Sequence, residues 1–176
     1  MSGSVPKVYN VLFLCTRNSA RSILAESIVN RLGRGRFRGY SAGSHPGGRV
    51  HPDAIELLID LGHETAHLES KGFDAFTGPD APRMDFVITV CDDAAGEACP
   101  VWPGHPVTAH WGIPDPVAAK GPSRAARSAL AKAYQRLEQR ISAFTELPVD
   151  QLSDADLKRK LQEIGEMEGV TALVGR

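Results

Sequence analysis

The sequence predicts an α/β fold of three layers, with a central four-stranded parallel sheet covered by helices on both faces and a helical appendage at the C-terminal end. Short apolar runs typical of buried strands alternate with segments in which apolar residues recur every three or four positions, as on one face of a helix. The 176 residues are also enough for one domain with a well-developed core. In such a sheet, ligands bind at the carboxyl ends of the strands.

The first strand is predicted at residues 8–14, an apolar run interrupted only by Asn10. Small polar residues follow, and a helix is expected from about Ala20 to Gly33, which is placed to end it. Its apolar positions recur every fourth residue at Leu24, Ile28 and Leu32. A second strand is expected at 36–41, before a loop at 44–49 that is rich in glycine.

A second helix is predicted to begin at Pro52, a residue favoured in the first helical turn, and to end before Gly62. Its apolar residues are Ile55, Leu58 and Leu61. Two more strands are expected at 85–90 and 106–110. Four strands therefore bring their carboxyl ends, and the loops that follow them, to one edge of the sheet.

A long helix is predicted after the fourth strand, because apolar residues there alternate spacings of four and three. These residues are Leu130, Tyr134, Leu137, Ile141 and Phe144. Pro148 then separates a domain of residues 1–147 from an appendage of residues 148–176. In the appendage, Ser153 and Asp156 are expected to cap a helix that runs to about Ile164.

Positive charge is concentrated at the start of the chain, where residues 1–50 hold eight Lys or Arg and Glu26 as the single acid. The net charge of the whole chain is only −1. A basic segment around a loop with small polar residues favours an anionic ligand, although Arg34, Arg36 and Arg38 also fit a solvated surface. Aromatic residues rarely interleave with these cations, so we expect no nucleic-acid partner.

The apolar run at 8–14 is too short to span a bilayer and makes a poor signal peptide. We therefore expect a cytoplasmic protein with no membrane partner. In that compartment the three cysteines are expected to be reduced, catalytic or metal-bound rather than joined in structural disulfides.

Cys15 lies between the first strand and the first helix, and five residues separate it from Arg21. Backbone N–H groups in such a loop can converge above the sulfur and bind a tetrahedral oxyanion. The predicted oxyanion-binding residues are Thr16, Arg17, Asn18, Ser19, Ala20 and Arg21. These groups are expected to lower the pKa of Cys15, so that it acts as a nucleophilic thiolate.

Two neighbours support this interpretation. Ser22 can donate its hydroxyl to the sulfur, and Asn18 tolerates a left-handed backbone, which suits the bend. The alternative is that Cys15 is a small core residue at the end of a strand and Arg21 an exposed helix residue.

The run VLFLCTRNSARSILAE at 11–26, followed by YSAG at 40–43, resembles the low-molecular-weight protein tyrosine phosphatase superfamily. The resemblance covers roughly residues 8–145 and implies that superfamily's fold. In these proteins a loop ending in Asp-Pro brings a general acid to the leaving oxygen, and HWGIPDP at 110–116 matches it. The resemblance therefore implies that Asp115 is the general acid, whereas Asp-Pro alone also fits an ordinary turn.

The segment VCDDAAGEACP at 90–100 is similar to that of the thioredoxin-coupled arsenate reductases within the superfamily. That resemblance implies reduction of arsenate by Cys15 and a disulfide relay through Cys91 and Cys99. It also implies an oxyanion substrate, an external thiol reductant such as thioredoxin or glutaredoxin, no bound cofactor and a monomeric enzyme. The separation of Cys91 and Cys99 looks one residue longer than in the best-known members.

Two other functions remain open. A tyrosine phosphatase would use Cys15, Arg21 and Asp115 through a phosphocysteine intermediate, but the aromatic substrate walls of those enzymes have no counterpart here. A structural zinc site could use Cys91, Cys99, His105 and His110, but these lack the usual close ligand pair. His51 and His63 are expected to cap or flank the second helix.

Two residues depart from the family pattern. Arg17 stands where the family usually has glycine, and we expect its side chain to point to solvent. Some relatives bind potassium through residues that match Asn18, Glu26 and Ser41, but Lys71 stands where a further acid is found. Its ammonium can replace the ion, so no metal is predicted.

Overall fold

The computed structural model describes residues 7–91, 102, 105–114, 116 and 123–167. A four-stranded sheet lies at its centre, in the order β2-β1-β3-β4, and all three neighbouring pairs are parallel. The strands are β1 (Tyr9–Cys15), β2 (Phe37–Gly43), β3 (Phe86–Thr89) and β4 (Val107–His110). The predicted fold class is confirmed, and the strand boundaries differ from the predicted ones by one or two residues.

The central strand β1 is buried on both faces, which explains its continuous apolar sequence. Residues 11–14 are all fully buried, and their side chains alternate between the two faces. Val11 and Phe13 belong to one hydrophobic cluster, whereas Leu12 and Leu14 belong to another. The sheet therefore separates two cores.

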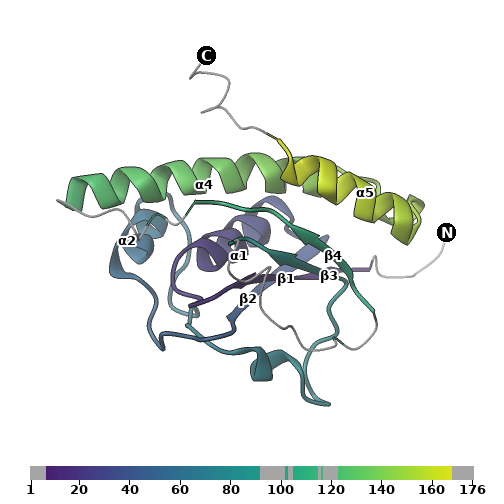
Figure 1. Cartoon of the computed structure of the whole chain (residues 1–176), viewed down its shortest axis with the longest axis horizontal. Helices are drawn as coiled ribbons and strands as arrows, with labels where there is room; N and C mark the ends of the chain where they lie inside the picture. Colours follow the sequence, from purple (N-terminus) through teal and green to yellow (C-terminus); the bar gives the residue numbers. More distant parts are fainter. Residues whose placement is uncertain (1–6, 92–101, 103–104, 115, 117–122, 168–176) are drawn as a thin grey trace.

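The larger core joins the sheet to four α-helices: α1 (Arg21–Leu32), α2 (Pro52–Asp60), α4 (Ser123–Thr145) and α5 (Asp154–Gly165). Figure 1 shows α4 and α5 running along one side of the sheet. The apolar residues predicted for the long helix, Leu130, Tyr134, Leu137, Ile141 and Phe144, are all buried in this cluster. Their spacing therefore predicted the inward face correctly.

The smaller core covers the opposite face of the sheet. In the described part of the chain it is closed by the 3₁₀ helix η1 (Phe73–Phe76), by Met84 and by Trp102. The Trp102 ring packs edge-on against Phe73, with 5.8 Å between the ring centroids. This short helix was not predicted, because four residues carry too little periodicity to indicate one.

The chain after Pro148 continues through η3 (Val149–Gln151) into α5. Ser153 caps α5 as predicted, since its side chain accepts a hydrogen bond from the Asp156 N–H. Leu157, Leu161 and Ile164 join the larger core. Trp111 donates its indole N–H to the Leu161 carbonyl at 2.9 Å, which ties α5 to the chain just after β4.

The expected ends of α2 are found, whereas Leu61, predicted as one of its apolar residues, follows the helix and is exposed. His51 is its N-cap, and its Nδ1 accepts a hydrogen bond from the Asp53 N–H. Gly62 follows the helix with a positive φ of 85°. Among the described residues, no helix combines the length and the apolar character needed to cross a bilayer.

Candidate active site

The loop of residues 15–22, called here the Cys15 loop, leaves the sheet at the carboxyl end of β1 and enters α1 at Arg21. The neighbouring strand β2 ends beside it, where Gly43 pairs with Cys15. A Cβ atom on Gly43 would lie 2.5 Å from the Thr16 carbonyl oxygen and 2.9 Å from the Asn18 nitrogen. Glycine is therefore required there, because any side chain would push the loop away.

The carbonyl groups of the Cys15 loop point outward. Those of Thr16, Arg17 and Ser19 accept hydrogen bonds of 2.8, 3.1 and 2.9 Å from backbone N–H groups of the segment 45–51. In a trans peptide the next N–H points the opposite way, so the N–H groups of residues 17, 18 and 20 face away from that segment. Within the described residues these three N–H groups have no acceptor. They remain available to an anion.

Asn18 fixes the bend of the loop. Its φ is +50°, so the predicted left-handed conformation is confirmed. The side chain is fully buried, and it donates to Ser22 Oγ at 2.8 Å while it accepts from the Lys71 N–H at 2.8 Å. One buried and one partly buried hydrogen bond therefore hold the turn between the start of α1 and the segment before η1.

Two loop side chains can be compared with their predicted positions. Arg17 is exposed, as predicted, and its carbonyl is held by Ser70 Oγ at 3.0 Å in addition to the backbone. Ser22 is fully buried, but it differs from the prediction: the hydrogen bond described for its hydroxyl is the one accepted from Asn18, not one donated to Cys15. Ser22 therefore supports the side chain of Asn18, and its action on the sulfur stays a prediction.

Cys15 and Cys91 lie together at the carboxyl ends of the neighbouring strands β1 and β3. Both are buried, with 4% and 1% of their surface exposed, and both are free thiols. The Thr16 N–H donates to Cys91 Sγ at 3.4 Å, and the Thr16 hydroxyl lies 3.6 Å from the same sulfur. The sequence placed these two cysteines at one edge of the sheet, and the structure brings them into contact.

This contact changes the expected ionisation of Cys15. A hydrogen bond with the Cys91 thiol, followed by burial, raises the pKa of Cys15, while Arg21 and the Thr16 N–H act in the opposite direction. The prediction of a lowered pKa is therefore wrong for this conformation. Although the sequence placed Cys91 at the same edge of the sheet, it did not indicate that the two thiols would share a hydrogen bond.

The Arg21 side chain reaches from α1 to the segment after β4. Its Nη1 donates to the Ile113 carbonyl at 2.8 Å. That segment continues alongside β3, since the N–H groups of Trp111 and Ile113 donate to the carbonyls of Thr89 and Val90. Arg21 therefore links the Cys15 loop to the residues that precede Asp115. Asp115 and Cys99 themselves lie outside the described residues.

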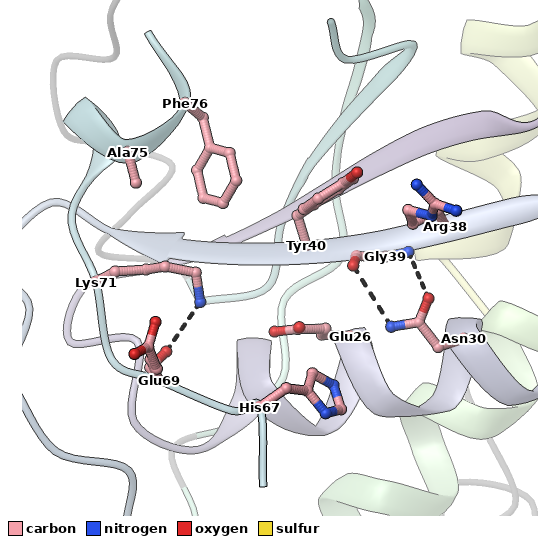
Figure 2. A pocket seen from close by; sticks show the side chains of 10 residues that line it. All are labelled: Glu26, Asn30, Arg38, Gly39, Tyr40, His67, Glu69, Lys71, Ala75 and Phe76. Atoms are coloured by element: carbon pink, nitrogen blue, oxygen red, sulfur yellow. Dashed lines mark hydrogen bonds between the residues drawn. The ribbon is translucent and has the colours of Figure 1, made fainter. Parts of the chain in front are cut away.

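Glu26 lies beneath the loop in a pocket of about 490 Å³, shown in Figure 2. Ser41 Oγ donates to Glu26 Oε1 at 2.6 Å. Burial raises the pKa of this carboxyl, and the Ser41 hydrogen bond and the charges of Lys71 and His67 oppose the rise. The charge of Lys71 thus favours ionised Glu26, but its ammonium donates to the Glu69 carbonyl at 3.0 Å, and its replacement of an ion stays a prediction. That no metal is needed stays a prediction.

The zinc interpretation gains no support from the described residues, in which no group of three or more His, Cys, Asp or Glu could hold a metal ion. His110 Nδ1 instead lies 2.7 Å from Thr89 Oγ1. His63 packs against α4, where its Nε2 lies 2.6 Å from the Tyr134 hydroxyl.

Comparison with known proteins agrees with this geometry. Residues 10–163 match the family model of the low molecular weight phosphotyrosine protein phosphatases. The arsenate reductase of Bacillus licheniformis is 33% identical over 137 residues, which cover 77% of this chain and 94% of that protein. The arsenate reductase of Archaeoglobus fulgidus is 29% identical in its crystal structure, with a TM-score of 0.56 and coverage of 74% and 98%.

A structure described as an arsenate reductase in the phosphate binding state is 27% identical, with a TM-score of 0.56 and coverage of 77% of this chain and 98% of that one. The family model spans most of the chain, and it includes the Cys15 loop, Cys91 and α5. The chain therefore belongs to the low molecular weight phosphotyrosine protein phosphatase family.

Proposed function

We propose that this chain is an enzyme that reduces arsenate to arsenite, with Cys15 as the nucleophile and Cys91 and Cys99 as relay thiols. The observation that carries the proposal is the contact between Cys15 and Cys91 at the ends of neighbouring strands. A phosphatase of this fold needs only the first of these thiols. The similarity to arsenate reductases supports the same function.

In the first step the Cys15 thiolate attacks arsenic(V), forms an S–As bond and displaces an oxygen, which leaves as water after protonation. Asp115 is the proposed acid, because oxide cannot leave without a proton. The free N–H groups at residues 17, 18 and 20 and the Arg21 guanidinium are the proposed partners of the remaining oxygens.

Attack requires that Cys15 first lose its proton. The hydrogen bond with Cys91 is the largest influence that raises the pKa of Cys15. When the bound substrate takes up the Cys15 proton, Arg21 and the Thr16 N–H remain to favour the thiolate. The proton carried by the thiol pair leaves to solvent or to the bound oxyanion.

In the second step Cys91 attacks Cys15 Sγ. The S–S bond forms, the S–As bond breaks, and its electron pair leaves with arsenic, which is thereby reduced to arsenite. Neighbouring strands lie about 4.8 Å apart, and a disulfide needs Cα atoms about 4.4–6.8 Å apart. Cys15 ends β1, Cys91 follows the end of β3 by two residues, and their thiols already share a hydrogen bond, so we expect this bond to require little movement of the backbone.

In the third step Cys99 attacks Cys91, releases Cys15 as a thiolate and leaves a Cys91–Cys99 disulfide. An external dithiol, thioredoxin or glutaredoxin, then reduces that bond and accepts its two oxidising equivalents. This cycle needs no bound cofactor. It does need a reducing compartment, so we also propose that the enzyme works in the cytoplasm, as a monomer.

A phosphatase remains the second candidate, because the Cys15 loop does not discriminate strongly between phosphate and arsenate. The phosphocysteine would form on the same sulfur. The loop at 44–49 contains no Phe, Tyr or Trp, and Trp111 is fully buried in the core, so neither can flank an aromatic substrate. Aryl phosphatase activity is therefore expected to be weak.

A coupled arsenate assay with an excess of thioredoxin, thioredoxin reductase and NADPH tests the assignment. Cys15→Ser should abolish both arsenate reduction and hydrolysis of an aryl phosphate. Cys91→Ser should abolish multiple-turnover reduction and keep the phosphatase activity. Equal rates of arsenate reduction in the wild type and Cys91→Ser would refute the relay, and a dominant phosphatase activity would favour the second candidate.

Mass mapping of disulfides after one arsenate turnover tests the order of the thiols. A Cys91–Cys99 bond is expected in the wild type, and a trapped Cys15–Cys91 bond in Cys99→Ser. Reduction of the oxidised wild type by thioredoxin and by glutaredoxin, in parallel, identifies the reductant. Stoichiometric zinc in the purified protein would contradict the relay, because its thiols would then be ligands.

A further inference from the structure

A second hollow lies at the far end of α1, away from the Cys15 loop. It has a volume of about 330 Å³, between the C-terminal half of α1 and the segment 62–67. Four of its lining residues, Ser27, Asn30, Arg31 and Arg34, follow the spacing of one helix face. His63 and His67 line the opposite wall. The proposed reaction uses none of these side chains.

The two arginines outnumber the single acid on the wall of this hollow, so they leave it with an excess of positive charge. In the described part of the chain, neither Arg31 nor Arg34 forms an ion pair with a carboxylate. Arg31 donates to the Leu61 carbonyl at 2.8 Å, and Arg34 has no described partner. Glu64 is the one acid on the wall. Two neighbouring guanidinium groups repel each other unless an anion joins them.

Ser27 provides an independent indication of a ligand. It is 5% exposed and lines the hollow, and its hydroxyl has no hydrogen-bond partner among the described residues. Buried hydroxyl groups without a partner are uncommon, because their loss of hydration is not compensated. The oxygen is covered in this structure, so an acceptor that enters the hollow would satisfy it after a small movement of the wall.

We propose that this hollow binds a small phosphorylated molecule or free phosphate, with Arg31 and Arg34 on the oxyanion and Ser27 as a hydrogen-bond donor. A tetrahedral oxyanion accepts several hydrogen bonds, which suits two guanidinium groups and a hydroxyl. The volume matches the lower end of small-molecule sites. It is too small and too enclosed for a folded partner. This proposal does not depend on the reaction of Cys15.

The site has a structural route to the Cys15 loop. His67 is shared with the pocket of Figure 2, and four residues later the same segment reaches Lys71. Ser70 and Lys71 hold the loop through Arg17 and Asn18. A ligand that joins α1 to the segment 62–67 therefore restrains the chain that supports the nucleophile.

An NMR titration of the ¹⁵N-labelled full-length protein with inorganic phosphate tests the proposal. The amide signals of residues 27–34 and 62–67 should shift along one binding curve, and those of residues 16–21 along another. The double variant Arg31→Gln/Arg34→Gln should raise the dissociation constant from the first curve by at least about tenfold. It should leave the dissociation constant from the second curve unchanged. Arg124→Gln, an exposed helix arginine elsewhere, is the matched control.

Ser27→Ala separates a ligand role from a structural one. It should lower the phosphate affinity measured by the first curve. It should not lower the melting temperature of the ligand-free protein, because the hydroxyl it removes has no hydrogen-bond partner among the described residues. A parallel titration with glycerol phosphate distinguishes an organic phosphate from the free ion by which binds more tightly. The proposal is overturned if the signals of residues 27–34 do not shift, or if the double variant binds as well as the wild type.

Discussion

The Cys15 loop and helix α5 are held in place by opposite means. The loop is fixed by hydrogen bonds to its carbonyls and to Asn18. Helix α5 is fixed mainly by apolar packing of Leu157, Leu161 and Ile164. The difference shows that stability and chemistry are assigned to different regions. The packed region determines whether the chain folds, and the hydrogen-bonded region determines where its N–H groups point.

The largest effect is expected from the packed region. Leu161→Ala should lower the free energy of unfolding by about 2–5 kcal/mol, because it leaves a cavity under a fully buried side chain. Single-turnover arsenate reduction per folded molecule should hardly change. Urea denaturation measures the loss, and Lys158→Ala on the exposed side of the same helix is the control. Equal stability losses would contradict the assigned role of α5.

Deletion of residues 148–176 extends this test to the predicted boundary at 147. Burial of three large apolar side chains contributes about 1.5–3 kcal/mol each, a large part of a typical total stability of about 5–15 kcal/mol. The shortened chain should therefore lose cooperative unfolding. If it unfolds like the full chain, the segment is a dispensable appendage.

Gly43→Ala should affect chemistry more than stability. Its Cβ would lie 2.5 Å and 2.8 Å from the carbonyl oxygens of Thr16 and Cys15, so the loop must shift. We expect a stability loss of about 1–3 kcal/mol and a larger fall in single-turnover arsenate reduction. Gly47→Ala is the matched control, because nothing lies within 4 Å of its Cβ position. An active Gly43→Ala would show that the loop tolerates displacement.

Asn18→Ala should give a similar pattern by a different route. It removes one buried and one partly buried hydrogen bond and places alanine at a positive φ. The cost to the free energy of unfolding is expected to be about 1–3 kcal/mol, with a marked loss of turnover. Asn18→Gly keeps the conformation and loses only the hydrogen bonds. Comparing the two variants in the same assay separates backbone strain from side-chain contacts.

The smallest effect concerns a polar contact inside the packed region. Burial, together with the charge of Arg31, lowers the pKa of His63 from 6.5 to about 4. The folded protein therefore binds the proton less readily than the unfolded chain, so this residue's contribution is complete above pH 6.5 and is lost as the pH falls towards 4. Because His63 is largely solvated, the loss is on the order of 1 kcal/mol or less.

His63→Gln isolates this contribution from that of the carboxylates. Glutamine can still hydrogen-bond to the Tyr134 hydroxyl but does not titrate. The variant should lose less stability than the wild type between pH 6.5 and 4 in urea denaturation. Parallel curves for the two proteins would show that His63 is not responsible.

The sequence predicted the fold and the identity of the loop because both depend on local patterns. Short segments between the helical patterns, apolar above all at 8–14 and 85–90, marked the strands, and the positions of Cys15, Asn18 and Arg21 marked the loop. It could not predict contacts between distant backbone atoms, such as the hydrogen bonds from segment 45–51 to the carbonyls of the Cys15 loop. The backbone of almost any residue can form such bonds. The sequence also missed the packing of α5, because an amphipathic helix does not reveal which surface it covers.

The ionisation of Cys15 was mispredicted for a related reason. Local sequence shows the groups that lower its pKa, Arg21 and the loop N–H groups, but the thiol that raises it belongs to Cys91, which follows the end of β3. The protonation state of such a thiol depends on residues that only the folded chain brings close. A motif alone therefore shows only some of the groups that raise or lower its pKa.

The contact between the two buried sulfurs also bears on oxidative damage. Peroxide converts a reactive thiolate to a sulfenic acid, and further exposure makes sulfinic and sulfonic acids that do not readily revert. A sulfenic acid on Cys15 would meet the Cys91 thiol at once and condense with it to a disulfide, with loss of water. Cys91, which disfavours ionisation of Cys15 in the ligand-free protein, thereby protects Cys15 from irreversible oxidation to sulfinic or sulfonic acid.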